Sequence, residues 1–294
     1  MRLDAHLAKQ YPEISRSAFQ KYIENGSVKL NGNVIYSSRQ EITDSDNVEV
    51  NFPAKNDFSA DIKDFARNII YEDDNVIVIN KPAGILTHSK GALNDEFTVA
   101  DFVKSRIASD DESFLDSNRP GIVHRLDRAT SGILIAAKNP ETQKLLQKQF
   151  ADRKAHKTYL AITESSPKLD EAKIDLPIGR DPKQPFKFRV DAMGKPAVTN
   201  YKILQSFDDE RALVELKPST GRTHQLRVHM AYIGAPILGD PVYGSSKSIS
   251  DTMFLHAVEL EITIPGASGG ERKIFKAPLP QEFVNLLGSN GETR

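Results

Sequence analysis

One acidic residue, Asp127, lies between two arginines in the stretch GIVHRLDRATSGILIAAKN, residues 121–139. Those arginines are Arg125 and Arg128, and a glycine with a run of small apolar residues follows them. An aspartate that nearby positive charge keeps ionised can act as a nucleophile or as a base. The alternative is a structural aspartate that only pairs with an arginine or forms a turn, and this motif alone does not separate the two.

Further polar residues gather in KPSTGRTHQLRVHM, residues 217–230. We expect a helix here that places Arg227 one turn after His224. His224 and His229 are five residues apart, so they lie on different faces of a helix and do not suit one metal ion. The pattern therefore indicates a polar face rather than a metal site, with a solvated basic stripe at a helix terminus as the alternative.

Tyr159 lies in the middle of the predicted strand HKTYLAIT, residues 156–163, with Lys157 on the same face. A tyrosine in a strand usually packs in the core, and the alternative is a role in catalysis or base stacking. The segment INKPAGILTH, residues 79–88, is explained by a proline-glycine turn. There is no Walker-type glycine loop, no G-x-G-x-x-G and no G-x-S-x-G elbow, so nucleotide cofactors and esterase chemistry have no sequence support.

The composition is that of a folded protein, with 294 residues of which 39% are hydrophobic and 27% are charged. The sequence has no cysteine, which excludes disulfides, thiolate catalysis and cysteine-based metal centres. No apolar run is long enough to cross a membrane, and the N-terminus carries charges where a signal peptide needs apolar residues. We therefore expect a cytoplasmic protein, and nothing in the sequence demands more than a monomer.

Charge is distributed unevenly along the chain, although the formal net charge is only −1. Residues 57–118 hold thirteen acidic and six basic residues, whereas residues 119–160 hold nine basic and three acidic residues. The basic block, which contains Asp127, is consistent with a nucleic-acid partner. An exposed amphipathic helix in PETQKLLQKQFADRKAH is the alternative source of this charge.

The N-terminal part predicts a small module of its own. Within residues 1–52 the pattern indicates two helices, the second capped by Ser15 and ended by Gly26, and then a hairpin around Asn31-Gly32. Such a small unit has a thin core, so binding is a more natural role for it than chemistry. Residues 53–67 have the polar composition of a linker.

Strand signals dominate residues 68–294 and do not alternate regularly with helices. This favours an α+β domain with a mixed, mainly antiparallel β-sheet over a doubly wound parallel sheet. The clearest strands are expected at 131–137, 156–163, 197–207, 211–217 and 253–263, and the helices near 97–109, 140–153, 222–233 and 281–288.

The motifs HRLDRATSG, HKTYLAI and TGRTHQLRVHM followed by PILGDPVYG resemble, in their order and separation, those of the RluA-type pseudouridine synthases. With NKPAGILTH and FLHAVEL, the resemblance covers roughly residues 68–290. Residues 1–52 resemble an S4 RNA-binding module, through Arg2-Leu3-Asp4, Ser15-Arg16 and VKLNG. The resemblance implies isomerisation of uridine to pseudouridine in a folded RNA, without a cofactor or a metal. The N1–C1′ bond breaks and the base rejoins the ribose through C5.

The resemblance also implies roles for individual residues. Asp127 is the catalytic nucleophile, Tyr159 is the aromatic residue that stacks on the uracil and is placed to move a proton, and Arg227 pairs with the Asp127 carboxylate. The aspartate either adds to the ribose C1′ or drives elimination to a glycal, and the sequence leaves both routes open. Arg125 is placed to fill the gap that the flipped base leaves. Contacts to the RNA backbone are expected from Arg128, Lys154, Lys157 and Arg222, and in the N-terminal module from Arg16, Lys21 and Lys29.

We expect structured RNA as the partner, with large-subunit ribosomal RNA favoured by the S4-like module and transfer RNA as the alternative. Two other function classes fit the same residues. The chain could hold RNA in two modules without altering it, in which case the Asp127→Asn change has no effect. An aspartate beside C1′ could also transfer the ribose C1′ to water. The chain would then be a hydrolase of the nucleoside bond.

Overall fold

The structure is a computed structural model of the chain, and it describes residues 1–12, 14–52, 56–88, 96–107, 114, 119–245, 252–266 and 269–289. The chain divides into two units. One comprises Met1–Asp61 with His88–Thr98, and the other comprises Ile62–Thr87 with Val99–Arg294. No helix in these described ranges is long and apolar enough to cross a lipid bilayer.

The first unit contains two helices and a small antiparallel sheet of strand order β2-β1-β3. Their bounds are α1 Leu3–Gln10, α2 Arg16–Glu24, β1 Val28–Leu30, β2 Asn33–Val34 and β3 Val48–Val50. The Ser15 hydroxyl accepts a hydrogen bond from the Ala18 N–H at 3.3 Å and caps α2. Asn31 and Gly32 have φ values of 51° and 80°, as a two-residue hairpin turn requires. The predicted helices and hairpin are confirmed.

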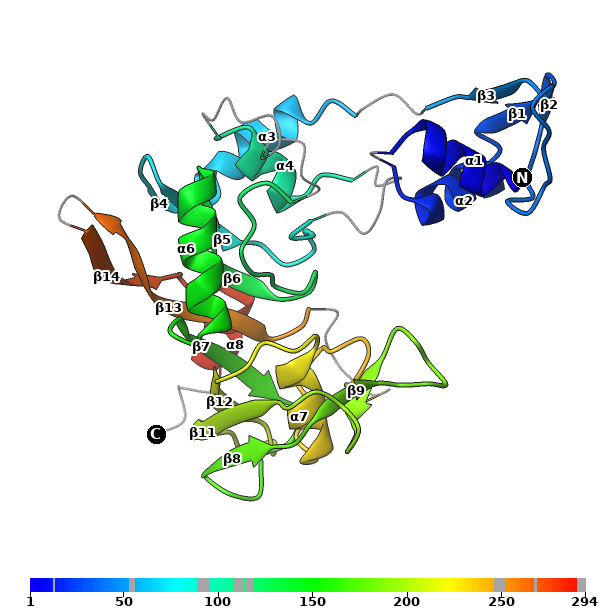
Figure 1. Cartoon of the computed structure of the whole chain (residues 1–294). Coiled ribbons are helices and arrows are strands. Elements are labelled where there is room, and N and C mark those ends of the chain that lie inside the picture. The colour runs from blue at the N-terminus through cyan, green and yellow to red at the C-terminus, as the bar shows by residue number, and fades with distance from the viewer. Residues whose placement is uncertain are drawn as a thin grey trace. The chain divides into compact units, whose positions relative to one another are not determined.

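The second unit is built on a nine-stranded sheet (Figure 1). Its strands are β4 Ile69–Glu72, β5 Val76–Lys81, β6 Ser131–Ala137, β7 His156–Thr163, β8 Glu171–Asp175, β11 Val198–Ser206, β12 Ala212–Pro218, β13 Leu255–Gly266 and β14 Gly269–Lys276. They run in the order β4-β5-β6-β13-β7-β12-β11-β8, and β14 pairs with β13. Only β6 and β13 are parallel in this sheet, so the predicted α+β class with a mixed, mainly antiparallel sheet is confirmed.

The remaining elements are a two-stranded ribbon, five helices and a 3-10 turn in the described part of the chain. They are β9 Ile178–Arg180, β10 Phe188–Val190, α3 Ser59–Phe65, α4 Val99–Lys104, α6 Pro140–Ala151, α7 Gln225–Tyr232, α8 Gln281–Ser289 and the turn Ala66–Asn68. Figure 1 shows α6 lying across the sheet. Gln149 of α6 fastens it there, because its side-chain amide donates to the Thr263 carbonyl of β13 at 2.6 Å and accepts from the Thr263 N–H at 2.9 Å.

The structure differs from the sequence-based elements at several points. Residues 59–65, in the stretch expected as a linker, form α3. The helix expected from residue 222 begins at Gln225 instead. The strands β8, β9, β10 and β14 were not predicted, because they are short or carry mostly exposed polar residues and therefore lack a clear apolar alternation. The strands at 131–137 and 156–163 have the predicted bounds.

The strand β6 is buried along its whole length, as expected for a strand covered on both faces. Gly132 near its start has a φ of 112°, and a Cβ atom at this position would lie 2.3 Å from the Ala257 carbonyl oxygen. Only glycine therefore lets β13 approach so closely. This contact fixes the segment that directly follows Asp127.

A buried histidine beside this contact makes the stability of the fold depend on pH. His256 on β13 is fully buried, its Nδ1 lies 2.9 Å from the Ser131 hydroxyl, and burial lowers its pKa to about 4. The unfolded chain, with an ordinary histidine pKa of about 6.5, binds the proton more readily. Stability from this group is therefore complete above pH 6.5 and is lost as the pH falls toward 4.

We expect the unfolding free energy to fall by roughly 3 kcal/mol through His256 between these two pH values. The measurement is urea unfolding between pH 4.5 and 7. The His256→Gln variant should show a shallower pH dependence than the parent, whatever its absolute stability. His6→Gln, at a histidine whose side chain forms no ion pair among the described residues, serves as the control and should keep the parental slope. Equal slopes for the parent and His256→Gln would contradict the prediction.

Candidate active site

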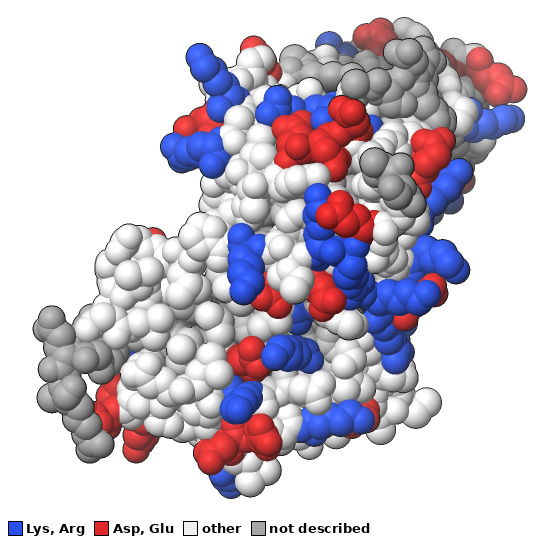
Figure 2. Space-filling view, turned by 90° about the vertical axis from the view of Figure 1, so that its left-hand side faces the viewer, with Lys and Arg blue, Asp and Glu red and all other residues white. Residues whose placement is uncertain are grey.

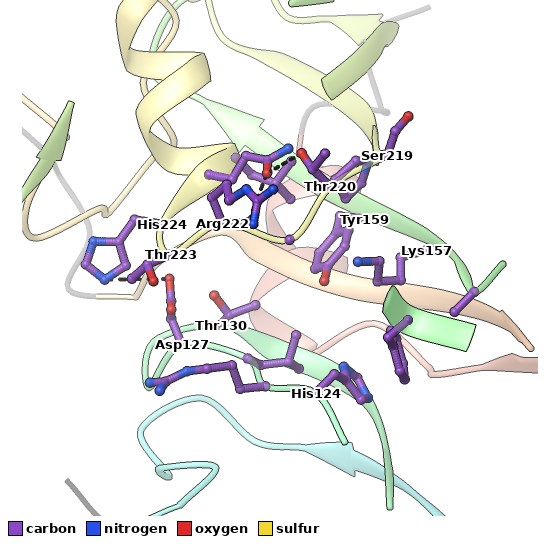
Figure 3. A pocket seen from close by; sticks show the side chains of 18 of the residues that line it. His124, Asp127, Thr130, Lys157, Tyr159, Ser219, Thr220, Arg222, Thr223 and His224 are labelled. Carbon is purple, nitrogen blue, oxygen red and sulfur yellow. Dashed lines mark hydrogen bonds and ion pairs between the residues drawn. The ribbon is translucent and has the colours of Figure 1, made fainter. Parts of the chain in front are cut away.

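A cavity of about 470 Å³ opens in the second unit, which is within the size range of small-ligand sites. Its walls come from residues within three segments that are distant in the sequence, 123–130, 150–159 and 218–227, together with Leu255. Figure 3 shows Asp127 and Thr130 on one side of it and Tyr159 and Lys157 on another. The cavity therefore brings together the residues that the sequence motifs singled out.

The Asp127 carboxylate is tied at one oxygen only. Its Oδ2 accepts a hydrogen bond from Arg227 Nη1 at 3.2 Å, and its side chain is 19% exposed. In the described part of the chain, Oδ1 has no hydrogen-bond partner. One oxygen thus anchors the carboxylate while the other is left for a ligand in the cavity.

The backbone around Asp127 is clamped by the segment INKPAGILTH. The Thr87 hydroxyl donates to the Leu126 carbonyl at 2.8 Å and accepts from the Leu126 N–H at 3.2 Å. The fully buried Lys81 ammonium donates to the Arg128 carbonyl at 3.3 Å and to two carbonyls of its own turn. Burial lowers the pKa of Lys81 to about 7, against the opposing effect of the nearby Asp127 charge. A turn alone does not describe this segment, because it holds the residues on both sides of Asp127.

Arg227 is buried and is shared by two carboxylates. Its Nε and Nη2 both donate to Asp240, each at 2.7 Å, and the ring of Tyr243 lies 5.1 Å from the guanidinium carbon. Asp240 Oδ1 also accepts from the N–H groups of Val242 and Tyr243. Burial opposes the charged form of Asp240, but the hydrogen bonds and charge of Arg227 outweigh it and lower the pKa of Asp240. The alternative of a solvated basic stripe is therefore wrong for Arg227.

His224 faces the same carboxylate from another side. It precedes α7 in the left-handed backbone region, with a φ of 56°, and its Nε2 lies 3.9 Å from Asp127 Oδ2. Its Nδ1 lies 2.9 Å from the Tyr243 hydroxyl, which accepts from the Phe188 N–H at 2.8 Å. Burial lowers the pKa of His224, with the charge of Asp127 opposing and that of Arg227 assisting. The imidazole is thus held neutral beside the carboxylate.

Tyr159 presents its ring to the cavity from the middle of β7. The residue is 8% exposed, and its hydroxyl has no hydrogen-bond partner in the described part of the chain. Burial, assisted by the charge of Asp127, raises the pKa of Tyr159, so the phenol is neutral at neutral pH. Lys157 lies on the same face and its pKa is lowered by burial. Lys157 lines the cavity, so it is less accessible to a phosphate of the RNA backbone than a lysine on the protein surface.

One wall of the cavity is a stacked pair of rings. His124 lies on Phe150 with ring centroids 4.5 Å apart and an interplanar angle of 22°. His124 Nε2 accepts a hydrogen bond from the Ile135 N–H at 3.0 Å, which requires a neutral ring. Burial and the nearby Lys157 charge lower the pKa of His124 to about 3. This wall is rigid, neutral and flat.

The other predicted RNA contacts lie in different settings. Arg125 and Arg222 line the cavity, and Arg222 Nε donates to the Pro196 carbonyl at 3.0 Å. Arg128 and Lys154 are exposed and lie outside the cavity lining, and Arg128 Nη1 donates to the Gly84 carbonyl at 3.3 Å. On the face that Figure 2 shows, basic side chains are interspersed with acidic ones.

In the first unit, one of the three predicted cations is already paired. Arg16 Nη2 donates to the buried Asp4 carboxylate at 3.0 Å, and Arg2 and Gln20 contact the same carboxylate. These hydrogen bonds outweigh burial and lower the pKa of Asp4 to about 2. Lys21 and Lys29 are exposed and have no carboxylate partner among the described residues. Asp4 and Arg16 therefore join α1 to α2.

His224 and His229, the two histidines considered as metal ligands, contact different residues in the structure. His229 is fully buried, with Nδ1 3.0 Å from the Thr199 hydroxyl and Nε2 donating to the Leu176 carbonyl at 3.0 Å. His224 contacts Tyr243 instead. Across the described ranges, no group of three or more histidine and carboxylate side chains is arranged to hold a metal ion.

Sequence reasoning missed two residues that complete the site, Asp240 and Tyr243. A signal was present, since a buried arginine needs a carboxylate and GDPVYG follows α7 closely. That signal depends on Arg227 being buried, which periodicity alone does not reveal.

Comparison with known proteins agrees with this geometry. A family model for RNA pseudouridylate synthase matches residues 75–232, and an S4 domain model matches residues 1–48. The chain is 35% identical to the ribosomal large subunit pseudouridine synthase D of Xanthomonas campestris, over 98% of this chain and 88% of that protein. It is 36% identical to an uncharacterized RNA pseudouridine synthase of Bacillus subtilis, over 97% of this chain and 93% of that protein.

A solved structure shows the same likeness in three dimensions. The human RNA pseudouridylate synthase domain containing 4 superposes with a TM-score of 0.59 at 27% identity, covering 78% of this chain and 95% of that one. Together with a cavity that gathers Asp127, Tyr159 and Arg227, these matches show that the chain belongs to the RluA-type RNA pseudouridine synthases and carries an N-terminal S4 domain.

Proposed function

We propose that this pseudouridine synthase acts on uridines of large-subunit ribosomal RNA, with Asp127 as the nucleophile and without a cofactor. The observation that carries the catalytic assignment is the single free carboxylate oxygen, Asp127 Oδ1, in a cavity that also holds the Tyr159 ring. The choice of RNA is supported by relatives named for the ribosomal large subunit, at 35% to 39% identity. A large-subunit ribosomal substrate is consistent with action in the cytoplasm.

We infer that Oδ1 is the reacting atom, because Oδ2 is held by Arg227. In the addition route, Oδ1 bonds to C1′ as the N1–C1′ bond breaks, the uracil anion turns, and C5 then displaces the aspartate. In the elimination route, Oδ1 takes a proton from C2′ as the N1–C1′ bond breaks, which leaves a glycal and a uracil anion. C5 then adds to C1′ of the glycal while the Asp127 carboxyl returns the proton to C2′. In both routes C5 finally loses its proton and N1, freed from C1′, gains one, so atoms and charge balance without a co-reactant.

The cavity supplies what a flipped base needs. Leaving the RNA stack costs a few kcal/mol, and stacking on an aromatic ring returns about 1–3 kcal/mol per base. Tyr159 provides such a ring, and the flat His124 and Phe150 pair forms a wall of the same cavity. We assign Arg125 to the gap that the base leaves, and Arg128, Lys154, Arg222, Lys21 and Lys29 to the RNA backbone. Lys157 is assigned to the flipped nucleotide, because it lies within the cavity.

The test uses large-subunit ribosomal RNA transcribed with uridine that carries tritium at C5. Isomerisation releases tritium to water and leaves the chain intact, hydrolysis releases free uracil, and a binding protein does neither. Mapping pseudouridines in RNA from cells with and without the gene then identifies the site. Tritium release from transfer RNA but not from ribosomal RNA would overturn the substrate assignment and keep the chemistry.

The Tyr159 ring and hydroxyl are expected to contribute separately. Tyr159→Phe keeps the ring, so RNA affinity should stay within about threefold, whereas loss of a positioned proton donor should lower kcat by about 10²-fold. Tyr159→Ala should also weaken RNA binding by about tenfold, since a stacking partner is lost. Binding is measured by filter retention and kcat by tritium release. A fully active Tyr159→Phe variant would show that the hydroxyl has no part in proton transfer.

A further inference from the structure

Residues 178–195, here called the basic hairpin, comprise β9, β10 and the two turns that follow them. The segment holds five basic residues against two acidic ones. It also exposes two large apolar side chains, Phe186 at 65% and Met193 at 94%. An exposed aromatic ring among cations is the combination on which proteins stack the bases of single-stranded nucleic acid.

Hydrogen bonds hold the turn that carries Phe186 in one conformation. The Asp181 carboxylate accepts from the Lys183 N–H at 2.8 Å, the Asp181 N–H donates to the Lys187 carbonyl at 3.0 Å, and Arg180 donates to the Pro185 carbonyl at 2.6 Å. The Lys187 ammonium lies 5.9 Å from the Phe186 ring centroid. Phe186 is therefore exposed on a fixed turn, with a cation beside its ring.

The base of the hairpin reaches the active site through Phe188. The Phe188 ring packs edge-on against His224 with centroids 5.6 Å apart, and His224 Nε2 lies 3.9 Å from Asp127. Phe188 N–H also donates to the Tyr243 hydroxyl. Phe186 is two residues away, which is at most about 7 Å along the chain. Figure 1 shows this ribbon beside α7, the helix that carries Arg227.

We propose that the basic hairpin binds the RNA strand next to the target uridine, with Phe186 stacking on an unpaired neighbouring base. Lys183, whose charge acts on Asp181 without a direct ion pair, and Lys187, which lies beside the Phe186 ring, contact its phosphates. RNA is the occupant favoured by the charge of the hairpin and by its continuity with a site that receives RNA. The proposal rests on the proposed function only in placing the uridine at Asp127.

The first test measures the affinity of full-length protein for a fluorescein-labelled oligouridylate of twenty nucleotides. Phe186→Ala should weaken binding about tenfold, as expected for loss of one stacked base. The double change Lys183→Ala with Lys187→Ala should lower the slope of log affinity against log salt by about 1.4, at about 0.7 per phosphate contact. Matched controls are Leu169→Ala, which removes a side chain 61% exposed elsewhere, and the exposed Lys202→Ala. Both should bind like the parent.

The second test is ultraviolet cross-linking of the protein to a ribosomal RNA transcript that contains 4-thiouridine. The peptide that contains Phe186 should carry the cross-link. Parental affinity in the hairpin variants, or a parent that does not bind the oligouridylate, would overturn the proposal. The two proposals fail separately. Weakened binding without any tritium release refutes the proposed function alone, and full tritium release with parental RNA affinity in the variants refutes the hairpin alone.

Discussion

We expect Asp127→Asn to reduce tritium release from C5-labelled ribosomal RNA by at least about 10⁴-fold, the scale of loss when a nucleophile is removed. The asparagine keeps the shape of the side chain and can still accept a hydrogen bond from Arg227 at the Oδ2 position. It offers no charged oxygen to C1′ or to the C2′ proton. RNA affinity should stay within about threefold, because Asp127 is not a phosphate contact.

The control is Asp175→Asn, which removes a carboxylate whose side chain is 58% exposed on β8. It should retain the parental rate, so the loss is not a general effect of removing an acid. Activity above about 1% of the parent in Asp127→Asn would rule out Asp127 as the nucleophile. Free uracil in the parent reaction would instead indicate hydrolysis.

The second large effect is expected at Arg227. The Arg227→Met variant leaves Asp240 buried without its partner, and breaking a buried ion pair in this way costs about 3–5 kcal/mol. In a protein of this size we expect the thermal midpoint to fall by about 10 °C. Because Asp127 loses its anchor as well, kcat should fall by about 10²–10³-fold.

A double variant separates the two contributions. In Arg227→Met with Asp240→Asn the buried charge is gone, and the asparagine oxygen still accepts from the Val242 and Tyr243 N–H groups. The thermal midpoint should recover by at least half, while kcat should stay low. Recovery of kcat together with stability would mean that Arg227 only supports the fold and does not position Asp127.

Much of the second unit could be predicted from the sequence because its central strands alternate or are continuously apolar. The segments 131–137 and 156–163 form strands with the predicted bounds. The peripheral strand β14 could not be found in this way, since its residues are mostly exposed and polar. Local patterns of apolar residues reveal a strand only where its side chains are buried. Strands at the edge of a sheet bury few side chains, so the patterns miss them.

The candidate site was predictable only in part. Asp127, Tyr159 and Arg227 could be chosen from motifs, but their convergence depends on strand pairing such as Tyr159 with Leu216 and Ala257, which joins distant parts of the chain. The role of Asp240 follows only once α7 is known to bury Arg227. Arg16 was chosen for its charge, and its pairing with Asp4 across two helices has no local signal.

The clamp that Lys81 and Thr87 place around Asp127 has a consequence for the energetics of RNA binding. Both residues are buried, and they fix the backbone at Leu126 and Arg128 before any RNA arrives. The conformational entropy of the nucleophile is therefore lost during folding and not at the encounter with substrate. The free energy gained from RNA contacts is then available to unstack the uridine, so the protein enters the reaction with its own geometry already preorganised.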